Sequence, residues 1–276
     1  MALNSIVTNI GAQVALQSLN KTNDALAVTQ KRISTGLRVA DARDDGAAFA
    51  VAERVRGEVA ATTSANEQLG AAKGLLDVTR ASLENVSGSL VKLKELTVKL
   101  ADGAITAEQR TQYQTQAKEL TNNIKAFITD ADYNGRNLVD TGGTTVKVVT
   151  NSTGDNYSVA AYDAIANIFN NISGANAYTQ GDAAAALTAT GKIGTAITNT
   201  LTQLNNFGSY TNYVETQVDF NKKKVDALEA GVGALVDADL AKESAKLQSL
   251  QIRQQLGTQA LGIANQAPQS LLSLFR

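Results

Sequence analysis

The residues from Leu69 to Leu100, LGAAKGLLDVTRASLENVSGSLVKLKELTVKL, decide the fold. Their large apolar side chains fall on two interleaved rows with a spacing of seven, which are the a and d positions of a coiled coil. The rows are Leu69, Leu76, Leu83 and Leu90, and Val86, Leu93 and Leu100. The first row extends back to Val55, so we predict one helix from about Asp44 to Leu100, roughly 85 Å long at ~1.5 Å per residue. Its narrow apolar stripe requires partner helices along its length.

Two other segments supply the predicted partners. Residues 101–103, Ala-Asp-Gly, predict the end of the long helix because glycine can adopt a left-handed C-cap. Thr106 and Gln109 form a capping-box pattern that starts a second helix, reaching about residue 129 and folding back antiparallel on the first. Heptads return over residues 184–235, which predicts a second long helix and the second partner.

The middle of the chain predicts a small β region. Asn134-Gly135 is a strong signal for a tight turn. Beyond it the apolar residues Val146 and Val148, and then Tyr157 and Val159, alternate with polar residues. The polar segment 151–155 separates the two pairs, which predicts a short hairpin. The remainder of 140–182 is rich in Asn, Ser, Thr, Gly and Ala, and we expect it to be irregular and to face the surface.

Both ends of the chain are amphipathic but loosely patterned. In the first 34 residues the apolar heptad is interrupted by Asn23 and Gln30, and residues 236–261 repeat this loose pattern. We expect these helices to be weakly ordered until another surface covers them. Gly36 can end the first helix, and Asp41 or Asp44 can cap the long helix that follows. The predicted fold is mainly α: an elongated antiparallel helical bundle of N- and C-terminal helices, with a β-hairpin region in the middle.

Composition excludes several kinds of chemistry. The 276-residue chain has no histidine and no cysteine, which removes histidine bases, thiol nucleophiles, common zinc sites and disulfides. Catalysis would have to rest on carboxylates, Ser, Thr, Tyr or Lys. We predict no catalytic residue, cofactor or metal. A formal net charge of -1 gives no electrostatic footprint for nucleic acid or a membrane surface. The N-terminus has no pattern of a cleaved signal, and we expect synthesis in the cytoplasm, which leaves open export by another route.

Several motifs in both ends of the chain resemble bacterial flagellin, the subunit of the flagellar filament. They lie in the same order as in that family, and the resemblance covers roughly residues 1–140 and 185–276. The motifs are ALNSIVTN at 2–9, RISTGLRV at 32–39, ARDD at 42–45, YNGRNL at 133–138 and ANQAPQSLLSL at 264–274.

The resemblance implies a structural, non-enzymatic subunit that self-assembles into the extracellular filament used for swimming motility. It implies an inner coiled-coil domain made by residues 1–43 and 238–276, ordered on polymerisation, and an outer helical-bundle domain over 44–237 with a β and irregular insert at about 130–182. It also implies export as an unfolded chain through the flagellar type III apparatus. The implied partners are further copies of the chain, an export chaperone on the C-terminal segment, and hook-associated and cap proteins.

The terminal apolar rows are the candidate assembly interface, because seams too interrupted to stand alone would gain partners in a lattice. The same leucine rows could instead form only an intramolecular core. The candidate residues are Ile6, Ile10, Leu19, Leu26, Ile33, Leu240, Leu247, Leu250 and Leu261.

A dense group of charged residues surrounds Gly36. It could be an ordinary solvated surface, or it could form ion pairs between subunits that set the register of the lattice; the resemblance favours the second, since exposed pairs alone stabilise little. The residues of this ionic patch are Arg32, Arg38, Asp41, Arg43, Asp44 and Asp45.

Four residues align with the stretch that an innate immune Toll-like receptor reads in some flagellins: Leu90, Lys92, Glu95 and Leu96. Stimulatory members carry arginine where this chain has lysine at positions 92 and 94. Because lysine lacks the planar bidentate contacts of arginine, we expect recognition to be poor.

Three alternative functions remain open at this point: a hook-filament junction protein, a monomeric helical enzyme and a helical calcium-binding module. A hook-filament junction protein shares the terminal coiled coils but would not extend into long filaments by itself. A helical calcium-binding module is suggested by residues 130–135, Asp-Ala-Asp-Tyr-Asn-Gly, which fit the first half of an EF-hand loop. Position 12 of that loop is Thr141, which cannot supply the bidentate carboxylate, so a hairpin turn is the favoured interpretation.

Overall fold

The computed structural model describes residues 8–188 and 190–273, and two compact units make up the chain. One unit comprises residues up to Gly57 and from Ala227 onward, and the other comprises Glu58–Asp226. We call them the terminal unit and the middle unit. In chain order the elements are α1 Ile10–Thr35, α2 Gly46–Ala101, α3 Ala107–Thr129, β1 Asp132–Tyr133, β2 Arg136–Asn137, β3 Val146–Val149, β4 Asn156–Val159, η1 Ile165–Phe169, α4 Asn170–Ile172, η2 Ala175–Ala177, α5 Gln180–Ala186, α6 Lys192–Val236 and α7 Leu240–Ser273.

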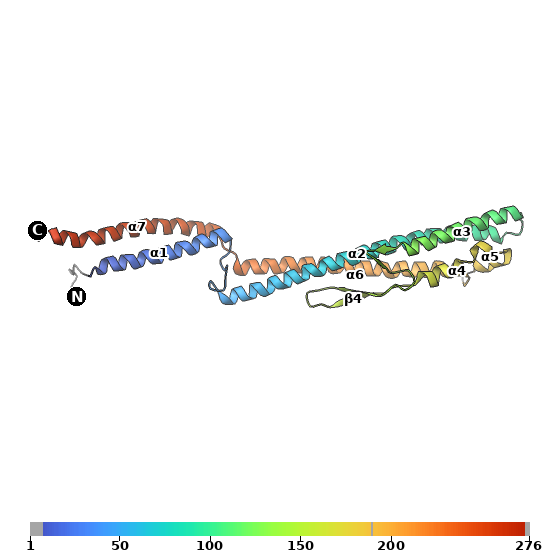
Figure 1. Cartoon of the computed structure of the whole chain (residues 1–276), viewed down its shortest axis with the longest axis horizontal. Coiled ribbons are helices and arrows are strands. Elements are labelled where there is room, and N and C mark those ends of the chain that lie inside the picture. Colours follow the sequence, from blue (N-terminus) through green and yellow to red (C-terminus); the bar gives the residue numbers. More distant parts are fainter. Residues whose placement is uncertain (1–7, 189, 274–276) are drawn as a thin grey trace. The chain divides into compact units, whose positions relative to one another are not determined.

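The middle unit is a helical bundle of α2, α3 and α6, which run side by side in Figure 1. The predicted heptad rows of α2 form its core, and the side chain of Leu90, for example, is 0% exposed. From the other two helices Ile124, Ile128, Phe207 and Val214 join the same apolar cluster. The prediction of one long helix packed against two partners is therefore confirmed.

The start of α3 confirms the predicted capping box. Thr106 Oγ1 accepts the Gln109 amide at 3.2 Å, and Gln109 Oε1 accepts the Thr106 amide at 3.0 Å. Arg110 Nη1 donates to Leu100 O at 2.8 Å and so covers a carbonyl at the end of α2. Farther along, Ser82 Oγ donates to Phe127 O at 2.5 Å. These contacts hold α3 antiparallel to α2.

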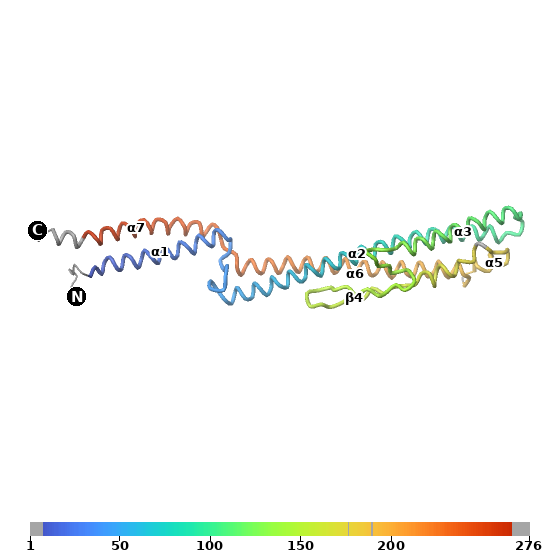
Figure 2. The backbone as a smooth tube through the Cα atoms, viewed as in Figure 1, coloured from blue at the N-terminus to red at the C-terminus, as the bar shows by residue number. Residues whose placement is uncertain are grey.

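Two hairpins follow, as predicted. Asn134 and Gly135 have φ angles of 54° and 75°, the left-handed pair that a tight two-residue turn between β1 and β2 requires. The second hairpin pairs β3 with β4, and Val146, Val148 and Val159 bury their side chains on its inner face. Figure 2 shows this hairpin running alongside α6. The Tyr157 ring of β4 stacks on the Tyr213 ring of α6, with 3.8 Å between the ring centroids.

The expectation that the rest of 140–182 is irregular and faces the surface is wrong for residues 165–177. A π-helical turn, η1, continues into α4, and Ile168 and Ile172 are fully buried in the core of the middle unit. Ile165, Ile168 and Ile172 have helical spacing. That signal was hidden by the surrounding Asn, Ser and Ala residues.

The second long helix does not begin near residue 184 as predicted. Residues 180–186 form the separate helix α5, capped by Thr179 and Asp182, and α6 begins only at Lys192. Between them the chain turns so tightly that a Cβ on Gly191 would lie 2.6 Å from the Ala186 carbonyl oxygen. The turn therefore depends on glycine at this position, and it interrupts the helical periodicity.

In the terminal unit, main-chain hydrogen bonds join the segment after α1 to the segment before α7. The α1 helix ends at Gly36, which has a φ of 71° as predicted. Val236 O accepts the amides of Arg38 at 2.7 Å and Val39 at 3.2 Å, and Gly36 O accepts the Ala238 amide at 2.9 Å. We call this pair of segments the clasp.

The cap of α2 is Asp45, not Asp41 or Asp44. Asp45 Oδ1 accepts the amides of Ala47 at 3.1 Å and Ala48 at 3.0 Å, which are first-turn donors without intrahelical acceptors. The two predicted candidates, Asp41 and Asp44, accept hydrogen bonds from Lys31 instead. Asp45, which directly precedes the helix, caps it.

Candidate functional site

Helices α1 and α7 pack side by side in the terminal unit (Figure 1). Residue numbers rise along one helix as they fall along the other at successive contacts, so the pair is antiparallel. The polar contacts are Asn9 Nδ2 to Ala264 O at 2.7 Å, Gln254 Nε2 to Asn23 Oδ1 at 2.8 Å and Arg32 Nη1 to Glu243 Oε1 at 3.2 Å.

The seam between α1 and α7 is narrow. Leu250 is 6% exposed, and Gly257 comes so close to Leu19 that an added Cβ would lie 3.2 Å from Leu19 Cδ1. Ile10 and Leu240 are 55% and 49% exposed and stand outside the seam, and Ile6 lies outside the described residues. The other predicted interface residues are half-buried, namely Leu19, Leu26, Ile33, Leu247 and Leu261. Their assignment to contacts between subunits stays a prediction.

Each terminal helix also carries a second apolar face. With 3.6 residues per helical turn, the apolar residues of this second face lie roughly opposite the seam on both helices. Ile10 apart, none of them is among the predicted interface residues, although their spacings of four, seven and fourteen could have revealed them. The face consists of Ile10, Val14 and Val28 on α1, exposed by 55%, 60% and 40%, and Ile252, Leu256 and Ile263 on α7, exposed by 58%, 58% and 70%.

A buried ion pair lies within the narrow seam. Glu243 is 8% exposed and pairs with Arg32, while Lys246 Nζ lies 3.8 Å from its second oxygen. Within the described part of the chain, the buried atoms Glu243 Oε2, Arg32 Nε and Thr29 Oγ1 make no hydrogen bond. Because a shift of one helix along the other would leave the buried Glu243 carboxylate without Arg32, whose side chain is 25% exposed, this pair is suited to fix the register of α1 against α7.

Replacing Glu243 with alanine is expected to loosen the helix pair, because the partly buried Arg32 guanidinium would lose its charged partner. We expect a cost of about 2 kcal/mol, which corresponds to roughly thirty-fold faster hydrogen exchange of protected amides in α1. Arg32→Met combined with Glu243→Ala should cost clearly less than the two single changes added together. Lys246→Ala, which removes only the longer contact, is the matched control, and equal effects of both changes would contradict a register role.

The predicted ionic patch is divided among several contacts within the terminal unit. Lys31 Nζ lies 2.7 Å from Asp41 Oδ2 and 3.1 Å from Asp44 Oδ2. The Arg38 guanidinium donates to Leu235 O, while Arg43 is exposed. Arg32 pairs with Glu243 and Asp45 caps α2, as described above. The structure thus gives most of these side chains a partner in their own chain, and a role in lattice register stays a prediction.

The Lys31 contacts shift the pKa of all three groups. The Lys31 hydrogen bond lowers the pKa of Asp41, and the Ala40 amide followed by Lys31 lowers the pKa of Asp44. The same two carboxylates raise the pKa of Lys31. The two carboxylates contribute to folding stability above the ordinary aspartate pKa, and this contribution is lost as the pH falls through their lowered pKa. The contribution of Lys31 to folding stability is lost as the pH rises through its raised pKa. The full contribution of this cluster to stability is therefore present between roughly pH 4 and pH 10, and it is small because the groups are exposed.

The four possible receptor-facing residues divide into two classes. Leu90 and Leu96 are 0% and 7% exposed in the core of the middle unit, whereas Lys92 and Glu95 are exposed on α2. A partner could therefore reach only the two charged side chains without repacking the core. Poor recognition by the receptor stays a prediction.

Family models identify the terminal helices. The model of the bacterial flagellin N-terminal helical region matches residues 6–144, and that of the C-terminal helical region matches residues 190–275. The chain belongs to the bacterial flagellin family. The family predicted from the terminal motifs is thus confirmed. Flagellins are structural proteins, and this chain is a structural subunit of a flagellar filament.

Relatives of this flagellin match over nearly their whole length. Flagellin FljK of Caulobacter vibrioides is 40% identical over 277 residues, covering 100% of both chains. A flagellin of Brucella melitensis is 37% identical and covers 99% of both. The flagellar filament 33 kDa core protein of Treponema phagedenis is 28% identical and covers 97% of this chain and 98% of its own.

A solved structure supports the fold of this flagellin. The crystal structure of Bacillus cereus flagellin matches with a TM-score of 0.50 at 20% identity, covering 56% of this chain and 88% of that one. The predicted mainly α fold class is confirmed. Within the part of the chain that the structure describes, no helix combines the length and the hydrophobicity needed to cross a bilayer.

Proposed function

We propose that this flagellin polymerises through its two terminal helices, with the second apolar faces of α1 and α7 as the contact surface. The observation that carries the proposal is the exposure of Ile10, Val14, Val28, Ile252, Leu256 and Ile263, by 40% to 70% of each side chain. Burying apolar area stabilises an interface by about 25 cal/mol per Å². Such faces mark contact surfaces, since the chain's own seam is on the other side of each helix.

The contrast between the two units supports an inner and an outer domain. The seam of α1 and α7 buries few apolar side chains, whereas the middle unit has a continuous core. A weakly packed pair gains stability from any partner that binds its folded form. We therefore assign residues 1–43 and 238–276 to an inner domain that becomes fully ordered on polymerisation and lines the filament channel. Residues 44–237 form the outer domain in this proposal.

The exposed apolar faces of the terminal helices also support the proposed export chaperone and accessory partners. Before assembly the apolar faces of α7 need cover, which supports a cytoplasmic chaperone on the C-terminal segment. A chain without cysteine cannot be crosslinked by disulfides, which suits passage through a narrow type III channel as an unfolded polypeptide. Hook-associated and cap proteins would meet the same terminal helices at the two ends of the filament.

Electron microscopy of the purified chain with sheared filament seeds tests the proposal. The intact chain is expected to elongate the seeds, while a variant lacking residues 1–40 and 238–276 is expected to stay monomeric. Circular dichroism of the truncated variant should still report the helical middle unit. If the intact chain stayed monomeric with ordered terminal helices, the proposal would fail, and short caps without elongation would point to a hook-filament junction protein.

A further inference from the structure

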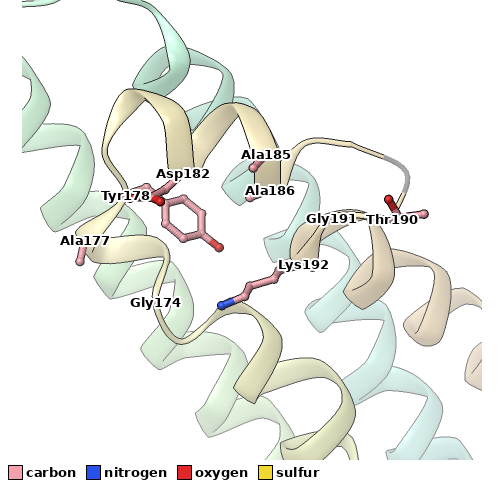
Figure 3. Close-up of a pocket in the computed structure, with 9 residues that line it drawn as sticks. All are labelled: Gly174, Ala177, Tyr178, Asp182, Ala185, Ala186, Thr190, Gly191 and Lys192. Atoms are coloured by element: carbon pink, nitrogen blue, oxygen red, sulfur yellow. The ribbon is translucent and has the colours of Figure 1, made fainter.

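A pocket of about 430 Å³ lies in the middle unit, between α5 and the start of α6. Much of its wall consists of residues with little or no side chain: Gly174, Ala177, Ala185 and Ala186. Figure 3 shows two longer polar side chains, those of Tyr178 and Lys192, extending toward the same space. The pocket therefore combines small walls with two convergent hydrogen-bond donors.

The Tyr178 hydroxyl lacks a partner in this pocket. Tyr178 is 6% exposed, and its buried hydroxyl makes no hydrogen bond to any of residues 8–188 and 190–273. Burying an unpaired hydroxyl is unfavourable, so a group that enters the pocket and accepts its hydrogen bond would be stabilised there. Burial raises the pKa of Tyr178, and Asp182 raises it further. The hydroxyl thus stays protonated at neutral pH and is available as a donor.

The pocket is also lined by one carboxylate, that of Asp182, which makes its own hydrogen bonds to Thr179. Asp182 Oδ2 accepts the Thr179 amide at 3.1 Å and the Thr179 hydroxyl at 2.7 Å, and these bonds lower the pKa of Asp182. Among the described residues, no salt bridge joins Asp182 to Lys192. The Lys192 ammonium is exposed, and although its charge contributes to the lowered pKa of Asp182, no salt bridge occupies it among the described residues.

The start of α6 adds positive potential to the same wall. Thr190, Gly191 and Lys192 line the pocket where this 45-residue helix begins. The first amides of a helix have no intrahelical acceptors, and the helix dipole places partial positive charge at this end. A hydroxyl donor, an ammonium group and a helix N-terminus together favour a negatively charged ligand.

We propose that this pocket binds a small oxyanion, a phosphate or a carboxylate, held by Tyr178 Oη and Lys192 Nζ. The small side chains of the wall leave room for the anion, and the volume of the pocket limits the size of the anion that fits. The site lies within the middle unit and uses none of the residues that we assign to polymerisation. Binding would therefore add a ligand-dependent contact between α5 and α6 to a structural subunit.

Two-dimensional amide NMR of the full chain tests this site with inorganic phosphate and, separately, acetate as probes. Ionic strength is held constant with chloride. We expect saturable shifts of the Gly191 and Lys192 amides with at least one of the two anions, and weakening of about tenfold in Tyr178→Phe and Lys192→Met, the usual effect of losing one hydrogen bond to a charged group. Lys222→Met, which removes an exposed lysine elsewhere on α6, is the matched control and should bind as the unmodified chain does.

Each outcome decides for or against the site. Saturation with phosphate alone or acetate alone would identify the anion class. Shifts that never saturate, or that are unchanged in Lys192→Met, would show general ion screening and overturn the proposal. Without ligand, Tyr178→Phe should have an equal or higher melting temperature because an unpaired hydroxyl is removed. A lower value would mean that the hydroxyl has a partner in the protein, which also overturns the proposal.

Discussion

Replacing both Ile252 and Leu256 with glutamate is expected to stop elongation of filament seeds. Both side chains are 58% exposed, so the change should leave the fold of the single chain intact. In the proposed interface they would place two carboxylates against apolar surface without cationic partners, at a cost of several kcal/mol. This is enough to raise the concentration needed for polymerisation by more than roughly a thousandfold. Sedimentation of seeded mixtures over a concentration series measures it.

Gln251→Glu is the matched control for this experiment. It adds one carboxylate to an exposed position of the same helix, away from the face that contains Ile252 and Leu256. We expect nearly normal elongation, and circular dichroism should match for all variants. Normal elongation of the double variant would show that this face of α7 is not the contact surface.

Replacing Leu90 with alanine is expected to lower the free energy of unfolding of the middle unit by about 3 kcal/mol. The side chain is 0% exposed and packs in the core with the rows of α2, so its loss removes buried apolar area and leaves a cavity. Urea unfolding followed by circular dichroism measures the change.

The neighbouring residue provides the control for Leu90. Val91 is 49% exposed on the same helix, and Val91→Ala should cost under about 1 kcal/mol. Similar losses for both variants would contradict the assignment of Leu90 to the core. A large difference would mean that Leu90 acts through packing, and that any partner binding near it contacts exposed neighbours such as Lys92.

The sequence predicted those parts of the fold that local signals define. Long heptads predicted α2, because two interleaved rows of large apolar residues form one stripe along a single helix, and this stripe must pack against partner helices. The capping box at Thr106 and Gln109 and the turn at Asn134-Gly135 are local devices whose geometry depends on a few adjacent residues. The structure confirms all three.

Features that depend on distant contacts were not predictable in the same way. The break before α6 follows from the close approach of Gly191 to the end of α5, which helical periodicity does not record. On α7 the seam and the second apolar face share one helical spacing, so the pattern alone does not tell which of them packs against the same chain. Tyr178 and Lys192 form no known motif, and only the turn between α5 and α6 brings them together.

The clasp has a consequence for the time at which the terminal unit can form. Its hydrogen bonds join the segment around Arg38 to the segment around Val236, and Arg38 and Leu235, which also contact each other, are 197 residues apart in the chain. Closing so long a loop is entropically costly, and folds dominated by distant contacts form slowly. At a synthesis rate of about 5 to 20 residues per second, α1 waits for many seconds before α7 exists. Throughout this interval the apolar side chains of α1 lack their partner helix, so the earliest hazard for this subunit is premature association of nascent chains.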